Sequence, residues 1–408
     1  MAGLGIAGCT SDPPKGAGRS EIRVGLLTSL SGTDTADGRD AERGAQLAAY
    51  VVNTDLQGVA LPLGPGQGLP RLGGARLAVA SADSGGSPER AVTEAVRLVG
   101  SDDVDALVTA DSAGVTAAVV QRTERLRIPS LDGHSSAGFL TNLGLDFYFR
   151  TAPADRDLGA IALSLVRSNG NGARRVAIIA SSDETAASLV PALRELAAEA
   201  GVEVVTAAEF APGSAGAANA AKQVRDATPD AVLAVAAAPA DAVEAVRAVQ
   251  SRGPALPVLG LGNGFLASDF SAKVGASGAG VFRVTPWSPE LASRQSVTKA
   301  VADLYQQRFD NPMSEVAAGT FTATLTLAAA VNDAAAVEPD KIRVALLGVR
   351  LPGARTIMPW DGVQFRENGQ NALASAAVEQ LAGGTFKVVF PRELASAPVA
   401  WPNPPPVG

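Results

Sequence analysis

The stretch Ile22-Arg23-Val24-Gly25-Leu26-Leu27-Thr28, continued by Ser29-Leu30-Ser31-Gly32-Thr33 and then by residues 40–53, decides the fold class. Its first part is a short apolar run that ends in a polar turn, which is typical of a buried strand. Residues 40–53 carry apolar side chains at helical spacing, namely Ala41, Ala45, Ala48 and Val52. The folded part of the chain therefore begins with a strand, a loop and a helix.

The same order repeats as far as residue 131 and then begins again after residues 147–151. In the first half we expect strands over 76–80, 104–109 and 128–131, helices over 88–99 and 115–126, and a hairpin or loop over the Gly/Pro-rich residues 61–74. In the second half we expect strands over 175–180, 202–206, 231–235, 256–260, 280–284, 363–365 and 386–389, and helices over 155–167, 184–200, 217–226, 240–251, 289–309 and 314–337. Alternating strands and helices predict parallel sheets that are covered on both faces.

Two successive units of this kind predict two α/β lobes, each with a doubly wound parallel sheet. Ligands of such sheets bind beyond the carboxyl ends of the strands, so two facing lobes would form a cleft there. The length of 408 residues agrees with two domains or with one large two-lobed unit.

Composition narrows the classes of function that the chain could have. The formal net charge of −7 argues against nucleic acid, which needs a basic face to neutralise phosphates. No apolar stretch reaches the roughly 18–20 residues of a membrane span. One cysteine excludes internal disulfides and zinc sites built on several thiolates, and one histidine leaves little room for metal or triad chemistry. We therefore expect no enzyme, no metal and no cofactor.

The single cysteine, Cys9, follows the small and apolar residues 4–8. This arrangement resembles the lipobox of bacterial lipoproteins, in which cleavage exposes a cysteine that carries a diacylglycerol anchor. Residues 1–20 would then be a signal remnant and a flexible tether that holds the protein at the extracellular face of the membrane. The alternative is a chance cysteine in a frayed terminus. None of the eight residues before Cys9 is Lys or Arg, so the basic start of a signal peptide is expected upstream.

Several short motifs, in their order, resemble the leucine/isoleucine/valine-type solute-binding proteins of ABC transporters. They are Leu30-Ser31-Gly32 with Gly38, Arg43-Gly44-Ala45 and Val51-Val52-Asn53, then Asp83-Ser84-Gly85-Gly86-Ser87-Pro88, Phe147-Tyr148-Phe149-Arg150-Thr151, Val284-Thr285-Pro286-Trp287, and Asp361-Gly362-Val363-Gln364-Phe365 with Asn368-Gly369. The resemblance covers residues 21–391. It implies a periplasmic-binding-protein type I fold, in which three crossover segments join two lobes that close on a ligand.

From this resemblance we expect lobe 1 to comprise residues 21–152 and 287–356, and lobe 2 residues 153–286 and 357–396, followed by a proline-rich tail over 397–408. Crossovers are expected near 151–153, 285–287 and 353–359. The implied partners are a small-molecule ligand, an amino acid or related carboxylate, and the permease of an ABC importer. The protein is expected to be a monomer.

The resemblance also implies where lobe 1 would hold a ligand carboxylate. The matching residues are Ser112 or Ala113 after one strand, and Ser135 through its backbone and Ser136 through its hydroxyl after the next. Both segments begin where a helix N-terminus favours an anion. The alternative is that these serines are simple N-caps. Asp111 and Asp132 would repel an anion there, so we expect them to face away or to contact an amine.

Lobe 2 departs from the family pattern. The acid that usually neutralises the ligand ammonium is missing from Leu261-Gly262-Asn263-Gly264, and the usual aromatic residues are missing from residues 181–185 and 236–239. Asp183 or Glu184 are candidate replacements, or else helix N-terminal acids that interact with the helix dipole. His134 is either a ligand contact or a loop residue, and Asn263 is a candidate ligand contact of lobe 2. Trp287 lines the hinge or packs in the core. A sensor module of the same fold that feeds a signalling partner is the alternative function.

Overall fold

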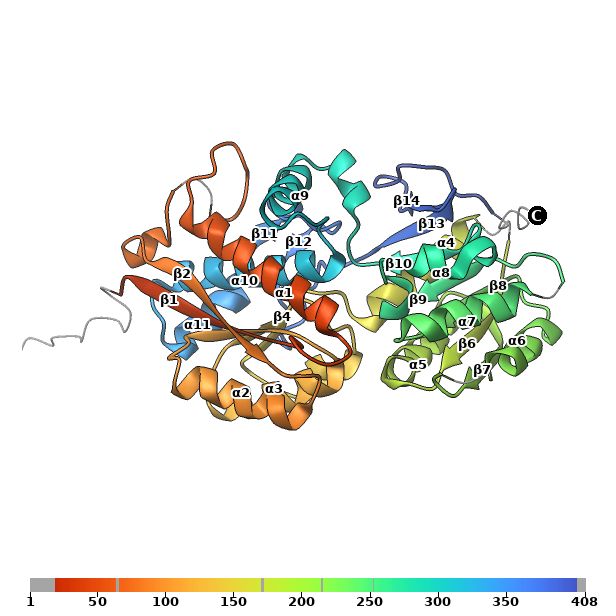
Figure 1. Cartoon of the computed structure of the whole chain (residues 1–408), viewed down its shortest axis with the longest axis horizontal. Helices are drawn as coiled ribbons and strands as arrows, with labels where there is room; N and C mark the ends of the chain where they lie inside the picture. The colour runs from red at the N-terminus through yellow and green to blue at the C-terminus, as the bar shows by residue number, and fades with distance from the viewer. Residues whose placement is uncertain (1–18, 64–65, 170–171, 214–215, 252, 402–408) are drawn as a thin grey trace, which may run out of the picture.

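The computed structural model describes residues 19–63, 66–169, 172–213, 216–251 and 253–401, which form two α/β lobes side by side (Figure 1). Cys9 and residues 1–18 lie outside the described residues, as do residues 402–408. The predicted lipidation site therefore stays a prediction.

Lobe 1 is built on a five-stranded, wholly parallel sheet in the order β2-β1-β3-β4-β5. Its strands are β1 Glu21–Thr28, β2 Arg76–Asp83, β3 Ala106–Ala110, β4 Ser130–Asp132 and β5 Tyr148–Arg150. Helices α2 (Pro88–Gly100) and α3 (Ala113–Arg125) cover one face, and α1 (Thr35–Asn53), α10 (Glu315–Ala334) and α11 (Pro339–Gly348) cover the other. Successive strand residues point to opposite faces, so Leu26 packs under α1 and α10 while Leu27 packs under α2 and α3.

Lobe 2 contains a seven-stranded sheet in the order β14-β13-β10-β9-β8-β6-β7. Its strands are β6 Arg175–Ser181, β7 Glu203–Phe210, β8 Ala231–Val235, β9 Val258–Leu261, β10 Phe282–Thr285, β13 Ala377–Ala382 and β14 Thr385–Phe390. The five strands β6–β10 are parallel and repeat the order of lobe 1. The antiparallel hairpin β13–β14 extends the edge, so this sheet is mixed rather than purely parallel as predicted.

Helices cover both faces of the second sheet as well. They are α4 (Asp155–Asn169) and α5 (Glu184–Glu199) on one face, and α6 (Ala217–Asp226), α7 (Pro239–Gln250) and α8 (Phe270–Val274) on the other. Helix α9 (Ser296–Phe309) and the short pair β11 (Leu351–Pro352) and β12 (Gly362–Val363) belong to lobe 1. Six 3₁₀ turns lie among the described elements: Pro70–Leu72, Gly138–Asn142, Asn263–Phe265, Gly275–Gly278, Pro289–Ser293 and Gly353–Arg355.

The chain crosses between the lobes after β5, after β10 and once more before β13. The third crossover comes later than the expected 353–359, because Ile357, Trp360 and Phe365 pack in the core of lobe 1. Lobe 2 therefore resumes after residue 365 and not at residue 357. The first and third crossovers run side by side: Arg150 Nε donates to Gln370 Oε1 at 2.8 Å, and Gln370 Nε2 donates to the carbonyl oxygen of Ala152 at 3.0 Å.

Both described ends of the chain are attached to the lobes. Arg19 of the expected tether bonds to the carboxylate of Asp105 at 2.7 Å. At the other end, the expected tail packs on lobe 2 as far as Trp401, whose ring lies 5.6 Å from that of Phe282. Over the described ranges no single helix is long and apolar enough to cross a membrane, and α10 with α11 passes that test only as a pair bent by 111°.

Candidate functional site

The predicted site segments meet where the two lobes face each other. Among the described residues, three hydrogen bonds connect lobe 1 to lobe 2 at this place, which we call the lobe junction. The backbone N–H of Gly114 donates to Glu184 Oε1 at 2.6 Å, Asn263 Nδ2 donates to His134 Nε2 at 3.1 Å, and the backbone N–H of Gly138 donates to Ser188 Oγ at 3.4 Å. The carboxyl ends of β3 and β4 in lobe 1 thus approach the start of α5 and the turn after β9 in lobe 2.

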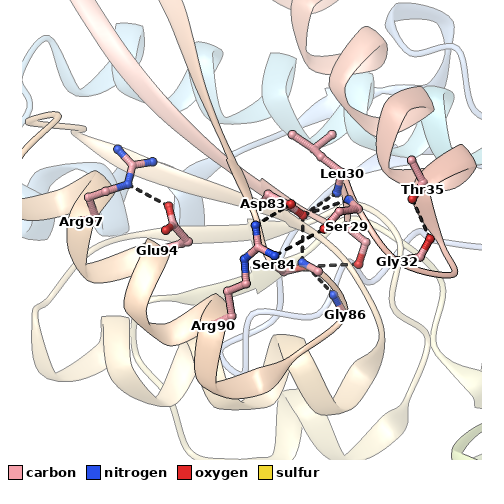
Figure 2. Close-up of polar contacts among 12 residues, drawn as sticks. Ser29, Leu30, Gly32, Thr35, Asp83, Ser84, Gly86, Arg90, Glu94 and Arg97 are labelled. Carbon is pink, nitrogen blue, oxygen red and sulfur yellow. Dashed lines mark hydrogen bonds and ion pairs between the residues drawn. The ribbon is translucent and has the colours of Figure 1, made fainter.

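Asp83 organises the loop after β1, as Figure 2 shows. Its Oδ1 accepts the backbone N–H groups of Leu30 at 2.9 Å, Ser31 at 3.1 Å and Gly85 at 2.9 Å, and its Oδ2 accepts from Arg90 at 2.6 Å. Burial alone would raise the pKa of Asp83, but hydrogen bonding by the Ser31 side chain, then by the backbone of Gly85 and Leu30, together with the charge of Arg90, brings it below its ordinary value. The Leu-Ser-Gly loop is therefore fixed by a carboxylate of the protein itself, which the sequence pattern did not indicate.

Asp111 lies buried among hydroxyl groups of lobe 1. Its carboxylate accepts from the hydroxyl of Ser84, from the backbone N–H of Ser112 at 2.9 Å, and from Ser29 Oγ at 3.4 Å. Burial raises the pKa of Asp111 above its ordinary value, although these hydrogen bonds oppose the rise. The three hydroxyl and amide partners make this carboxylate part of the lobe's internal structure.

The turn after β4 is held in the same way by Asp132, which is fully buried. Asp132 Oδ1 accepts the backbone N–H groups of His134 at 2.8 Å and Ser135 at 3.0 Å, while Oδ2 accepts the hydroxyl of Tyr148 at 3.0 Å. The backbone N–H of Ser135, expected to meet a ligand, is thus bonded inside the lobe. Its hydroxyl donates to the carbonyl oxygen of Asp111 at 3.1 Å. Ser136 is half-buried, and its side chain keeps its predicted role as a proposal.

At the start of α3, Ser112 is an exposed N-cap whose hydroxyl accepts from the backbone N–H of Val115 at 3.4 Å. Ala113 is the first helical residue, and the N–H of Gly114 receives the carboxylate of Glu184 from the other lobe. A helix N-terminus favours a negative charge. The position at which a ligand carboxylate was predicted therefore holds a carboxylate of the protein.

Asp183 and Glu184, the two candidate amine partners, have different surroundings. Asp183 caps α5 and accepts from the backbone N–H groups of Ala186 at 2.9 Å and Ala237 at 3.0 Å. It also accepts from the hydroxyl of Ser181. Its oxygens are therefore used within lobe 2, as the helix-capping alternative supposes. Trp287 packs in the core of lobe 1, where its Nε1 donates to the carbonyl oxygen of Ile357 at 2.9 Å.

A further acid, Glu315, lies beside His134. It is the first residue of α10, its Oε2 is 3.8 Å from His134 Nδ1, and its side chain is 11% exposed. Burial raises the pKa of Glu315 to about 7, with Asp37 adding to the rise and His134 opposing it. Burial lowers the pKa of His134, but Glu315 and other carboxylates outweigh it and leave a net rise. The sequence offered one weak sign of this acid, its place directly after a Ser at the start of a predicted helix.

Comparison with known proteins shows to which family the chain belongs. A family model described as periplasmic binding protein matches residues 21–385. Leu/Ile/Val-binding protein homolog 8 of Brucella suis biovar 1 (strain 1330) is 22% identical over 97% of this chain and 96% of its own length.

Two solved structures share the two-lobe fold. The branched-chain amino acid transporter substrate-binding protein LivJ of Streptococcus pneumoniae, in complex with isoleucine, has a TM-score of 0.72 at 20% identity and covers 91% of this chain and 100% of that one. An ABC transporter solute-binding protein of R. palustris, in complex with benzoate, has a TM-score of 0.69 at 20% identity and covers 90% of this chain and 95% of that one. The match to the family model, which extends over most of the chain, shows that the chain belongs to the periplasmic binding protein family.

Proposed function

We propose that this protein is an extracellular solute-binding protein that captures an amino acid or a related carboxylate between its lobes and delivers it to the permease of an ABC importer. Cys9 would carry the lipid that holds the protein at the outer face of the membrane. In this role the protein catalyses no reaction. It binds, closes and releases.

The observation that supports this proposal most is the lobe junction. His134, a predicted ligand contact of lobe 1, is bonded to Asn263, a predicted contact of lobe 2. Glu184, also predicted in lobe 2, is bonded to Gly114, which directly follows the predicted contact Ala113. The first and third crossovers are hydrogen-bonded to each other, which suits a hinge about which the lobes rotate.

The proposed ligand class rests on the start of α3. An exposed helix N-terminus that binds the carboxylate of Glu184 has the chemistry to bind the carboxylate of a solute. The solute would displace Glu184 as it enters, so opening of the junction and binding are linked. The complexes of two similar proteins, with isoleucine and with benzoate, agree with a carboxylate ligand.

The test is a thermal-shift screen of the full chain against the twenty common amino acids, small amides and carboxylates such as benzoate. A ligand that binds only the folded protein adds about 2.7 kcal/mol at a hundredfold excess over its dissociation constant. We expect at least one amino acid or carboxylate to raise the melting temperature. If no compound of either class does so, the proposal is wrong.

A further inference from the structure

The carboxylates at and near the lobe junction are not equally available to a solute. Asp132 is bonded to two backbone N–H groups and a tyrosine hydroxyl, and Asp183 to two backbone N–H groups and a serine hydroxyl. Glu184 lies on the N-terminus of α3. Each of these acids already has the partners that a buried or capping carboxylate requires.

Glu315 differs from them. Across the part of the chain that the structure describes, no hydrogen-bond donor reaches its carboxylate, and its one ion-pair contact there is His134 Nδ1 at 3.8 Å. That separation is too long for a hydrogen bond. A carboxylate that is 11% exposed and lacks a donor has lost most of its hydration without replacement.

His134 supplies the second observation. Its side chain is 10% exposed, and its Nδ1 is buried with no hydrogen-bond partner among the described residues. Because Asn263 Nδ2 donates to Nε2, the neutral imidazole carries its proton on Nδ1. An unpaired N–H donor therefore lies beside the unpaired carboxylate of Glu315, at the point where lobe 1 meets lobe 2.

A donor next to an acceptor matches a solute that carries both kinds of group. Asp37, in the first turn of α1, adds a second negative charge near Glu315, so the cationic end of such a solute is favoured on the Glu315 side. We infer that Glu315 binds the ammonium group of the solute and thus replaces the acid that the turn after β9 lacks, with the N–H of His134 facing the solute's acceptor. This inference rests on the proposed function and narrows its ligand class to α-amino acids and related amines.

Because the pKa of Glu315 is raised, solute binding would change the protonation of this residue. An ammonium group stabilises the ionised carboxylate, so binding below pH 7 would expel a proton from the pair that Glu315 forms with His134. The groups that face this pair are Asp37 from α1 and Asp111 and Asp132 from the strand ends of lobe 1. Proton release on binding is therefore a readout that a merely structural glutamate would not change.

The experiment compares matched solutes by calorimetry with the full chain. Each amino acid that raises the melting temperature is tested beside the carboxylate that lacks its amine; for leucine this is 4-methylpentanoate. The variants are Glu315→Gln, which keeps the side chain's shape, Glu315→Asp, which keeps its charge, and the control Asp340→Asn. Asp340 is also an acid in the first turn of a helix, but it pairs with Arg127 and is 68% exposed.

We expect the amino acid to bind at least about tenfold more tightly than its deaminated analogue, and Glu315→Gln to weaken amino-acid binding by at least about tenfold. Glu315→Asp should retain part of the affinity, and Asp340→Asn all of it. Calorimetry at pH 6 in buffers of different ionisation enthalpy should show proton release for the wild type and much less for Glu315→Gln.

Three outcomes would overturn the inference while leaving the proposed function intact. They are binding of carboxylates without an amine at equal affinity, undiminished amino-acid binding by a folded Glu315→Gln variant, and equal proton release by that variant and the wild type. Failure of every solute to bind would instead refute the proposed function, and the inference with it.

Discussion

Helix α10 approaches its neighbours closely on two sides, and this can be tested by adding a single methyl group. A Cβ atom built on Gly319 would lie 2.2 Å from the carbonyl oxygen of Gly133 in the turn after β4. On another side of the helix, a Cβ atom on Gly44 of α1 would lie 2.3 Å from the carbonyl oxygen of Ala317. Helix α10 therefore has little room to move away when Gly319 becomes Ala.

The magnitude follows from these distances. The contact of 2.2 Å is far shorter than the ordinary 3.4–4 Å, and the obstructing atom is backbone rather than a flexible side chain. Overpacking costs about 1–3 kcal/mol, and we expect the upper end here because the backbone must shift. Replacing Gly by Ala in a helix stabilises the helix by about 1 kcal/mol. The net loss in the free energy of unfolding should be about 2 kcal/mol.

The assay is urea unfolding followed by tryptophan fluorescence in a Trp401→Phe background. The remaining tryptophans, Trp287 and Trp360, both lie in the core of lobe 1 and report on that lobe. The matched control is Gly100→Ala at the end of α2, where an added Cβ meets no atom of the described residues within 4 Å. The control should lose no stability. A Gly319→Ala variant as stable as its parent would refute the close approach of α10 to the turn that carries His134.

Three further predictions concern the acids of the site. Glu184→Ala should raise the affinity for a carboxylate-bearing solute about fivefold in calorimetry, because the solute no longer competes with the hydrogen bond between Glu184 and Gly114, which is worth about 1 kcal/mol. Weaker binding by this variant would contradict the prediction. Asp132→Asn should lower the free energy of unfolding by about 2 kcal/mol in urea, since an amide bonds less strongly to the N–H groups of His134 and Ser135; an unchanged midpoint would argue against that role. The pKa of Glu315 is about 7 in the folded protein and exceeds the unfolded value, so the folded state binds more protons. As pH rises from about 4.5 to 7, the free energy of unfolding of the wild type should therefore fall by on the order of 3 kcal/mol relative to that of Glu315→Gln. Parallel pH profiles of the two proteins would exclude this.

The periodicity of the sequence predicted most of the fold, because the strands of both sheets are short apolar runs between amphipathic helices. It located α2 within one residue of its bounds, Pro88–Gly100, and α5 within one residue of Glu184–Glu199. It did not predict β13, whose residues Glu379 and Gln380 are buried through contacts with distant residues. Such long-range pairing leaves no local pattern. The third crossover was misplaced for a similar reason, because nothing in the local sequence shows which core the apolar residues Ile357, Trp360 and Phe365 join.

The site was less predictable than the fold. The sequence identified the segments that meet at the lobe junction, but not that Asp83 and Asp132 would bond the loop N–H groups. Nor did it identify Glu315, which is 181 positions from His134 and reaches it only because α10 packs against β4. A carboxylate's partners depend on the tertiary fold, so its role at a site cannot be inferred from neighbouring residues alone.

The most direct test of the central claim is a crystal structure of the full chain grown with the amino acid that stabilises it most. We expect electron density for that amino acid at the lobe junction, with its carboxylate on the N-terminus of α3 in place of Glu184 and its ammonium group within hydrogen-bond distance of Glu315. A ligand bound anywhere other than between the lobes, or a junction still closed by Glu184 with the ligand bound, would contradict it.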